Sequence, residues 1–234
     1  MLDAAATAIT NLDLPKVVLA IGSLGTAAYG VVDVTKGFGG GISNRGFGDI
    51  KKVVSKFISA EGNDGASALA LPSALATLRA NWLNGMALAD QKSIAKALVK
   101  LNLTKASARR MAAVAGVDGD LLTIVADKIV TAESLSQQET DVYGRFDLLL
   151  TALLDQGYQR GDQRYRNSAK LVAVPVAIVL AVLGAWAIAG GGLTSADVWR
   201  AFVAGLLATP LAPIAKDLSS AIQAGAKVAQ SWKK

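Results

Sequence analysis

The side chains that could do chemistry in this sequence are carboxylates, lysines, hydroxyls and tyrosines, because its 234 residues include no histidine and no cysteine. Disulfides, thiolate nucleophiles, zinc-finger sites and haem ligation by His or Cys are therefore excluded. Proton transfer by histidine and Ser-His-Asp triads are excluded as well. The carboxylates form no recognisable constellation, and Asp118-Gly-Asp120 lacks the further ligand spacing of an EF-hand. We therefore expect a non-enzymatic protein with no cofactor and no metal.

The stretch KGFGGGISNRGFGDI, which begins at Lys36, is a second candidate site, since it holds six of the 23 glycines. Glycines that lead into a helix can cradle a phosphate. However, no strand precedes this stretch, and no Lys-Ser/Thr pair follows its glycines as a nucleotide-binding loop requires. We interpret residues 36–48 as a glycine-rich elbow at the membrane surface. There Phe38 and Phe47 would enter the headgroup boundary, while Lys36 and Arg45 would bind lipid phosphates.

The elements that position these residues are long uncharged segments. Hydrophobic residues make up 52% of the chain and charged residues 18%, against globular averages of roughly 45–50% and about 25%. Residues 171–196 carry no charge, and about 20 apolar residues suffice for a helix to span a bilayer. Residues 17–32 and 201–215 are shorter, so they could instead be core helices or a re-entrant pair; Trp199 at the headgroup level would extend the last one. We predict transmembrane helices over 17–35, 169–192 and 198–215.

Cations near the ends of these segments indicate an orientation, because Lys and Arg collect on the cytoplasmic side of membrane proteins. They follow the first segment, precede the second and follow the third: Lys36, Arg45, Lys51, Lys52, Arg160, Arg164, Arg166, Lys170, Lys216, Lys227, Lys233 and Lys234. We expect the N-terminal tail 1–16 and the loop 193–197 outside the cytoplasm, and the middle domain and the amphipathic tail 216–234 inside it. The sequence begins without the basic region of a cleavable signal peptide. The expected location is the bacterial inner (plasma) membrane.

Between the first and second spans, residues 49–168 predict a cytoplasmic helical domain, since apolar residues recur there at helical spacing and no strand-like alternation persists. Asp90, Thr104 and Asp118 can each cap a helix, Gly116 can end one, and Ser136-x-x-Glu139 is a capping-box pattern. No proline interrupts the helix that follows before Pro175, so it can continue into the second span. The fold class is an all-α membrane protein.

Two further sets of residues lie in or beside the spans. Gly22, Thr26 and Gly30 recur every four residues, a pattern that lets membrane helices approach closely, either within the chain or between copies. The second set is a possible ion path formed by Asp33, Pro210 and Pro213. Paired prolines should kink or break the last helix, and broken helices can line transport paths. Asp33 has a simpler interpretation, a local ion pair with Lys36.

These patterns favour an integral membrane protein that self-associates as a structural scaffold or a pore-forming assembly. The alternatives are a transporter or channel subunit and, in a third class, a membrane-bound enzyme or effector. The expected partners are the lipid bilayer, anionic headgroups and further copies of the chain. The lysines and arginines between residues 92 and 110 have no aromatic residue among them, so we expect no nucleic acid, and the sequence identifies no small-molecule substrate.

Overall fold

The computed structural model describes residues 13–59 and 70–231, with side chains to residue 224. The chain forms two compact units. The first unit, which we call the span unit, combines Met1–Gly39 with Asn167–Lys234, and the second, the middle unit, is Gly40–Arg166. Throughout the described residues the secondary structure is helical and contains no strand, which confirms the all-α class.

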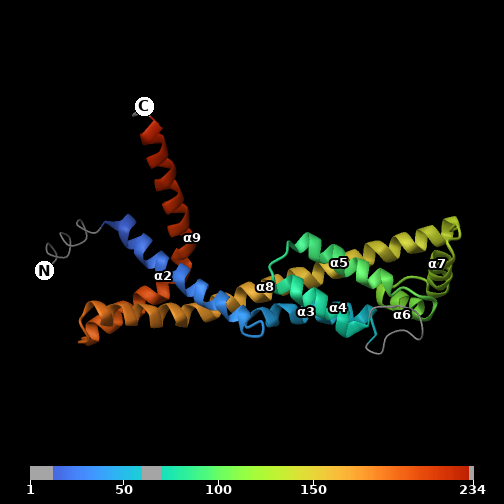
Figure 1. Cartoon of the computed structure of the whole chain (residues 1–234), viewed down its shortest axis with the longest axis horizontal. Helices are drawn as coiled ribbons and strands as arrows, with labels where there is room; N and C mark the ends of the chain where they lie inside the picture. The colour runs from blue at the N-terminus through green and yellow to red at the C-terminus, as the bar shows by residue number, and fades with distance from the viewer. Residues whose placement is uncertain (1–12, 60–69, 232–234) are drawn as a thin grey trace. The chain divides into compact units, whose positions relative to one another are not determined.

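Figure 1 shows the described helices in chain order. Their bounds are α2 (Leu14–Val34), the 3-10 turn η1 (Thr35–Gly37), α3 (Ser43–Phe57), α4 (Leu71–Leu83), α5 (Leu88–Leu101), α6 (Lys105–Ala115), α7 (Gly119–Thr131), α8 (Gln137–Ile188) and α9 (Ser195–Ser231). Of these, α2, α8 and α9 are each long and apolar enough to cross a membrane.

Local capping explains where several helices begin and end. Thr104 caps α6 in a reciprocal capping box with Ser107, and Gly116 ends that helix in the left-handed conformation. The backbone amides of Asp120 and Leu121 both donate to the Asp118 carboxylate at the start of α7. These boundaries, which the sequence predicts, are confirmed.

The capping box before α8 is confirmed as well, because the Ser136 amide donates to Glu139 Oε2 at 2.7 Å and the Glu139 amide donates to Ser136 Oγ at 3.4 Å. The prediction that Asp90 caps a helix is wrong. α5 begins at Leu88 after Ala87, so Asp90 lies in its first turn, where a carboxylate still meets the positive end of the helix dipole.

α8 is one helix of 52 residues (Figure 1). At 1.5 Å per residue it extends about 78 Å. The sequence prediction that this helix continues into the second span is therefore confirmed. Pro175 lies inside it without ending it.

The middle unit has a conventional apolar core formed by α3 to α7 and the first part of α8. Its largest fully buried side chains include Tyr158, Phe57 and Phe146. The backbones of α3 and α8 meet closely, because a Cβ added to Gly46 would lie 2.5 Å from the carbonyl oxygen of Gly161. Glycine at both positions is therefore required by packing, since any larger residue would separate the two helices.

Candidate functional site

The buried positions of the span unit are occupied almost entirely by small residues. On α8 they are Ala169, Ala173 and Ala177, and on α9 they are Ala201, Gly205, Ala208, Thr209, Ala212 and Ala215. Large side chains such as Leu183, Trp186 and Leu206 are exposed. Helices that pack through small residues and present large apolar ones outward are typical of membrane interiors, where close van der Waals contact drives association.

One face of α2 packs against α9 at the backbone level. A Cβ added to Gly22 would lie 2.1 Å from the Ala215 Cβ, and one added to Gly25 would lie 2.1 Å from the Ala208 carbonyl oxygen. Both contacts are closer than any real Cβ contact, so neither position accepts even alanine without movement. Gly22 therefore packs within the chain. Gly25 was not predicted as a packing residue, although its spacing of three from Gly22 places it on the same helix face.

A second face of α2 is small and exposed. Thr26 and Ala27 lie three and four residues after Ser23, and Gly30 lies four and three residues after them, so all four lie on one side of the helix. A Cβ added to Gly30 would have no neighbour within 4 Å. The three residues that recur every four positions thus lie on two different faces of α2. Gly22 is buried, while Thr26 and Gly30 remain accessible to a neighbouring molecule.

A polar groove of about 420 Å³ lies where α2 and α9 cross. Six of its eight lining residues are polar: Ser23, Thr26, Lys216, Ser219, Ser220 and Gln223. α2 has 21 residues, about 31 Å at 1.5 Å per residue, which matches a hydrocarbon core of about 30 Å. Ser23 and Thr26 stand near the middle of this helix, so a polar groove borders the part of α2 expected deepest in a bilayer.

The course of α9 creates this groove. A Cβ on Gly205 would meet the Ile178 Cα at 2.5 Å, so the first part of α9 packs on α8. The helix continues through Pro210 and Pro213, and its final red portion in Figure 1 runs in a different direction from its orange start. Proline removes a backbone donor and bends a helix. The bend brings Ala215 onto Gly22 and turns Lys216 into the groove.

The three residues of the possible ion path are not gathered in this groove. Asp33 forms an ion pair with Lys36 one turn along the chain, as the simpler interpretation predicted. Pro210 and Pro213 are exposed on α9, and none of the three lines the polar groove. The two prolines shape the groove indirectly, because they bend α9 and so set the direction of the helix that forms one of its walls.

The residues expected at the membrane interface occupy different environments. Phe38 is 80% exposed and is followed by three glycines with positive φ, at 69°, 97° and 47°. Lys36 is in η1, and Arg45 is exposed on α3. Trp199 is exposed near the start of α9 and stacks on Phe202 with ring centroids 5.5 Å apart.

Phe47 differs from the sequence expectation. It is only 7% exposed and belongs to the core of the middle unit. The reason is that α3 already begins at Ser43, so the second Gly-Phe-Gly is helical, and the elbow is confined to the residues before it. In that helix Gly46 packs on α8, and Phe47 turns into the core beside it.

A further open groove of about 530 Å³ runs along α2, α8 and α9 in the span unit. Its walls are mostly Ala, Leu and Ile, with Asp197 and Arg200 as the charged members. These two side chains approach to 3.7 Å, and Asp197 also accepts a hydrogen bond of 2.6 Å from the Thr194 hydroxyl. The charged residues of this groove thus cap the start of α9.

Ionised groups of the middle unit join helices together. Asp147 on α8 pairs with Lys96 at 2.6 Å and with Lys100 at 2.5 Å, both from α5. Burial alone would raise the pKa of Asp147, but the hydrogen bonds from Lys100 and Lys96 outweigh it and hold that pKa below its usual range. The Lys128 ammonium and the Ser136 amide likewise lower the pKa of Glu139. Carboxylates held ionised in this way suit structural roles better than proton transfer at neutral pH.

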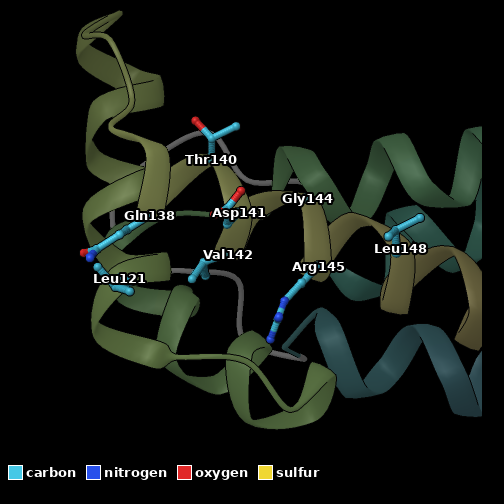
Figure 2. Close-up of a pocket in the computed structure, with 8 residues that line it drawn as sticks. All are labelled: Leu121, Gln138, Thr140, Asp141, Val142, Gly144, Arg145 and Leu148. Carbon is cyan, nitrogen blue, oxygen red and sulfur yellow. The ribbon is translucent and has the colours of Figure 1, made fainter.

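An open pocket of about 770 Å³ in the middle unit lies beside the start of α8. Figure 2 shows Asp141 and Arg145 pointing in opposite directions from this helix, so its charged groups do not converge on one point. Within residues 13–59 and 70–231, moreover, no three His, Cys, Asp or Glu side chains are placed to hold a metal ion. The polar groove of the span unit is therefore the stronger candidate site.

No protein-family model, curated protein or solved structure shows a significant match to the chain.

Proposed function

We propose that the protein is an integral membrane protein whose copies associate side by side and enclose a polar pore, with the middle unit in the cytoplasm. The observation that carries the proposal is the groove of six polar residues alongside the middle of α2. Polar and ionisable groups at membrane depth are costly in lipid and normally face a protein interior or water. This groove is open on one side, so it requires either a neighbour or water.

A second copy meets this requirement. The exposed small face of α2 borders the groove, because Ser23 and Thr26 belong to both. Small residues at spacings of four allow a neighbouring helix to approach closely. Gly30 offers the closest approach, since no described atom of the chain's other elements lies within 4 Å of the position of its missing Cβ. Copies joined along this face would bring their grooves together and surround a polar path.

We propose an orientation with Lys36 and Lys170 on the cytoplasmic side, as positive charges at span ends favour, in a bacterial inner membrane. Single cysteines at positions 140 and 194 in right-side-out vesicles test it with a membrane-impermeant maleimide. Labelling of position 194 alone is expected before lysis. Labelling of position 140 in intact vesicles would contradict the orientation.

Purified protein in lipid vesicles tests the function. We expect it to release entrapped small ions, and to have a mass in mild detergent that is a multiple of 24.0 kDa. The Gly30→Leu variant should insert but lose both properties, whereas Gly184→Leu is the matched control, because it adds the same side chain at a second open position. Assembly of copies without release of entrapped ions would favour the alternative of a structural scaffold. A monomer at concentrations well above trace would refute self-association.

A further inference from the structure

We propose that the pore selects anions, and that Lys216 is the residue that determines this selectivity. The inference rests on the proposed pore and adds the class of ion that it conducts. Among the described residues, the groove is lined by one ionisable side chain, Lys216, together with the hydroxyls and the amide of its polar wall.

No described carboxylate neutralises this lysine. In the described part of the span unit, Asp13 pairs with Lys16, Asp33 with Lys36, and Asp197 with Arg200. The remaining carboxylate there, Asp217, follows Lys216 in the chain but does not line the groove. Among the side chains that the structure describes, no carboxylate oxygen lies within 4 Å of the Lys216 ammonium. Its positive charge therefore acts on whatever enters the groove.

The wall beside Lys216 offers hydrogen-bond donors. Ser219 and Gln223 lie three and seven residues after Lys216 along α9, so the three side chains lie on one face. Neither the Ser219 hydroxyl nor the Gln223 amide has a hydrogen-bond partner among the described residues. An ammonium, a hydroxyl and an amide NH₂ can all donate to an anion. Together they replace part of its hydration shell.

The hydroxyls on α2 complete a neutral polar wall. Ser23 donates to the Leu19 carbonyl oxygen at 2.7 Å, and Thr26 donates to the Gly22 carbonyl oxygen at 3.1 Å. Both oxygens can still accept hydrogen bonds from water. A small monovalent anion such as chloride would thus pass partly hydrated between this wall and the donors on α9.

The lysine charge alone is sufficient for measurable selectivity. One unit charge 4 Å from a monovalent ion favours an anion over a cation about thirtyfold, even at the dielectric constant of water. Salt reduces this preference by screening. We therefore expect a chloride-to-potassium permeability ratio of about ten or more in the assembled protein at low salt.

The experiment measures reversal potentials across planar bilayers that contain the full-length protein, in a potassium chloride gradient. Lys216→Arg should keep the anion preference, because it keeps the charge. Lys216→Gln should reduce the permeability ratio about tenfold, to near unity, and Lys216→Glu should reverse it in favour of potassium. Lys170→Gln is the control, since Lys170 is exposed on α8 and does not line the groove.

The outcomes separate the inference from the proposed function. A protein that inserts and yet conducts no ion refutes the pore. Conductance with a cation preference, or with a ratio near unity in the wild type, refutes the inference and leaves the pore in place. An anion preference that is unchanged in Lys216→Gln and Lys216→Glu also overturns it. Loss of selectivity in Lys216→Gln together with its retention in Lys216→Arg supports the assignment and excludes a general folding defect.

Discussion

Leucine substitutions at two glycines of α2 should have opposite consequences, although the two positions are only eight residues apart. At Gly22 the new side chain would begin 2.1 Å from the Ala215 Cβ. At Gly30 it would begin in open space, with no atom of the chain's other elements within 4 Å. Gly22→Leu therefore disturbs the packing of the single chain, and Gly30→Leu leaves that packing intact.

The expected magnitudes follow from these distances. A Cβ contact of 2.1 Å is more than 1 Å shorter than an ordinary van der Waals contact of 3.4–4 Å, and leucine adds three more carbons beyond Cβ. Overpacking of this kind costs typically 1–3 kcal/mol. At Gly30 the substitution removes a helix-destabilising glycine, so the single chain should gain up to about 1 kcal/mol. The neighbouring copy, in contrast, would lose its closest contact.

The assay combines two measurements on detergent-solubilised protein. Thermal unfolding followed by circular dichroism reports the packing of the chain, and light scattering during size exclusion reports the mass of the assembly. Gly22→Leu should lower the unfolding midpoint by several degrees, roughly 2–4 °C for each 1 kcal/mol in a chain of this size. Gly30→Leu should keep or raise the midpoint and shift the mass toward the 24.0 kDa of one chain.

Two results would refute this reasoning. An unchanged assembly mass in Gly30→Leu would show that copies do not meet at this face. An unchanged unfolding midpoint in Gly22→Leu would show that α2 and α9 do not pack as closely as the 2.1 Å separation requires. Gly184→Leu again controls for added bulk at an open position.

The middle unit and the bend of α9 support three further predictions. Asp147→Asn should destabilise the middle unit by about 1–3 kcal/mol, because it weakens charged hydrogen bonds from two lysines. Lys100 and Lys96 hold the pKa of Asp147 below its usual range. The stability that ionised Asp147 contributes in the wild type is therefore present above the ordinary carboxyl pKa and is lost as the pH falls through the folded-state pKa. Acid unfolding followed by circular dichroism should accordingly depend less steeply on pH in the variant than in the wild type. Gly46→Ala should lower the unfolding midpoint, as its Cβ would lie 2.5 Å from the Gly161 oxygen, whereas Gly48→Ala, with no atom within 4 Å, should not. Replacing Pro210 and Pro213 together by alanine should straighten α9 and reduce the release of entrapped ions without preventing insertion, and wild-type release would contradict the role of the bend.

Sequence patterns predicted those features that depend on neighbouring residues. Thr104, Asp118 and the Ser136–Glu139 box define helix ends because a cap acts on backbone amides within one turn. The continuity of α8 followed from the absence of a proline before Pro175. The three apolar helices followed from length and hydrophobicity, which are also local properties.

Features that depend on distant residues were not predicted. Gly-Phe-Gly has the same composition in a turn and in a helix, and what places Phe47 in the core is the contact of Gly46 with Gly161, more than a hundred residues along the chain. The polar groove was missed for a similar reason. Lys216, Ser219 and Gln223 form a helical polar face that the sequence does contain, but α2 meets it only because α9 bends.

The division of α2 into two faces links folding to the proposed assembly and conduction. Because α9 occupies the face with Gly22 and Gly25, the face of α2 left for a second copy is the one with Thr26 and Gly30. Thr26 is also part of the groove wall, so the contact between copies and the wall of the proposed path share a residue. Variants that separate the copies must then abolish conduction, whereas Lys216 variants should change the selected ion and leave the assembly mass unchanged. This asymmetry is specific to a path enclosed between copies, because a path within one chain would conduct equally well as a monomer.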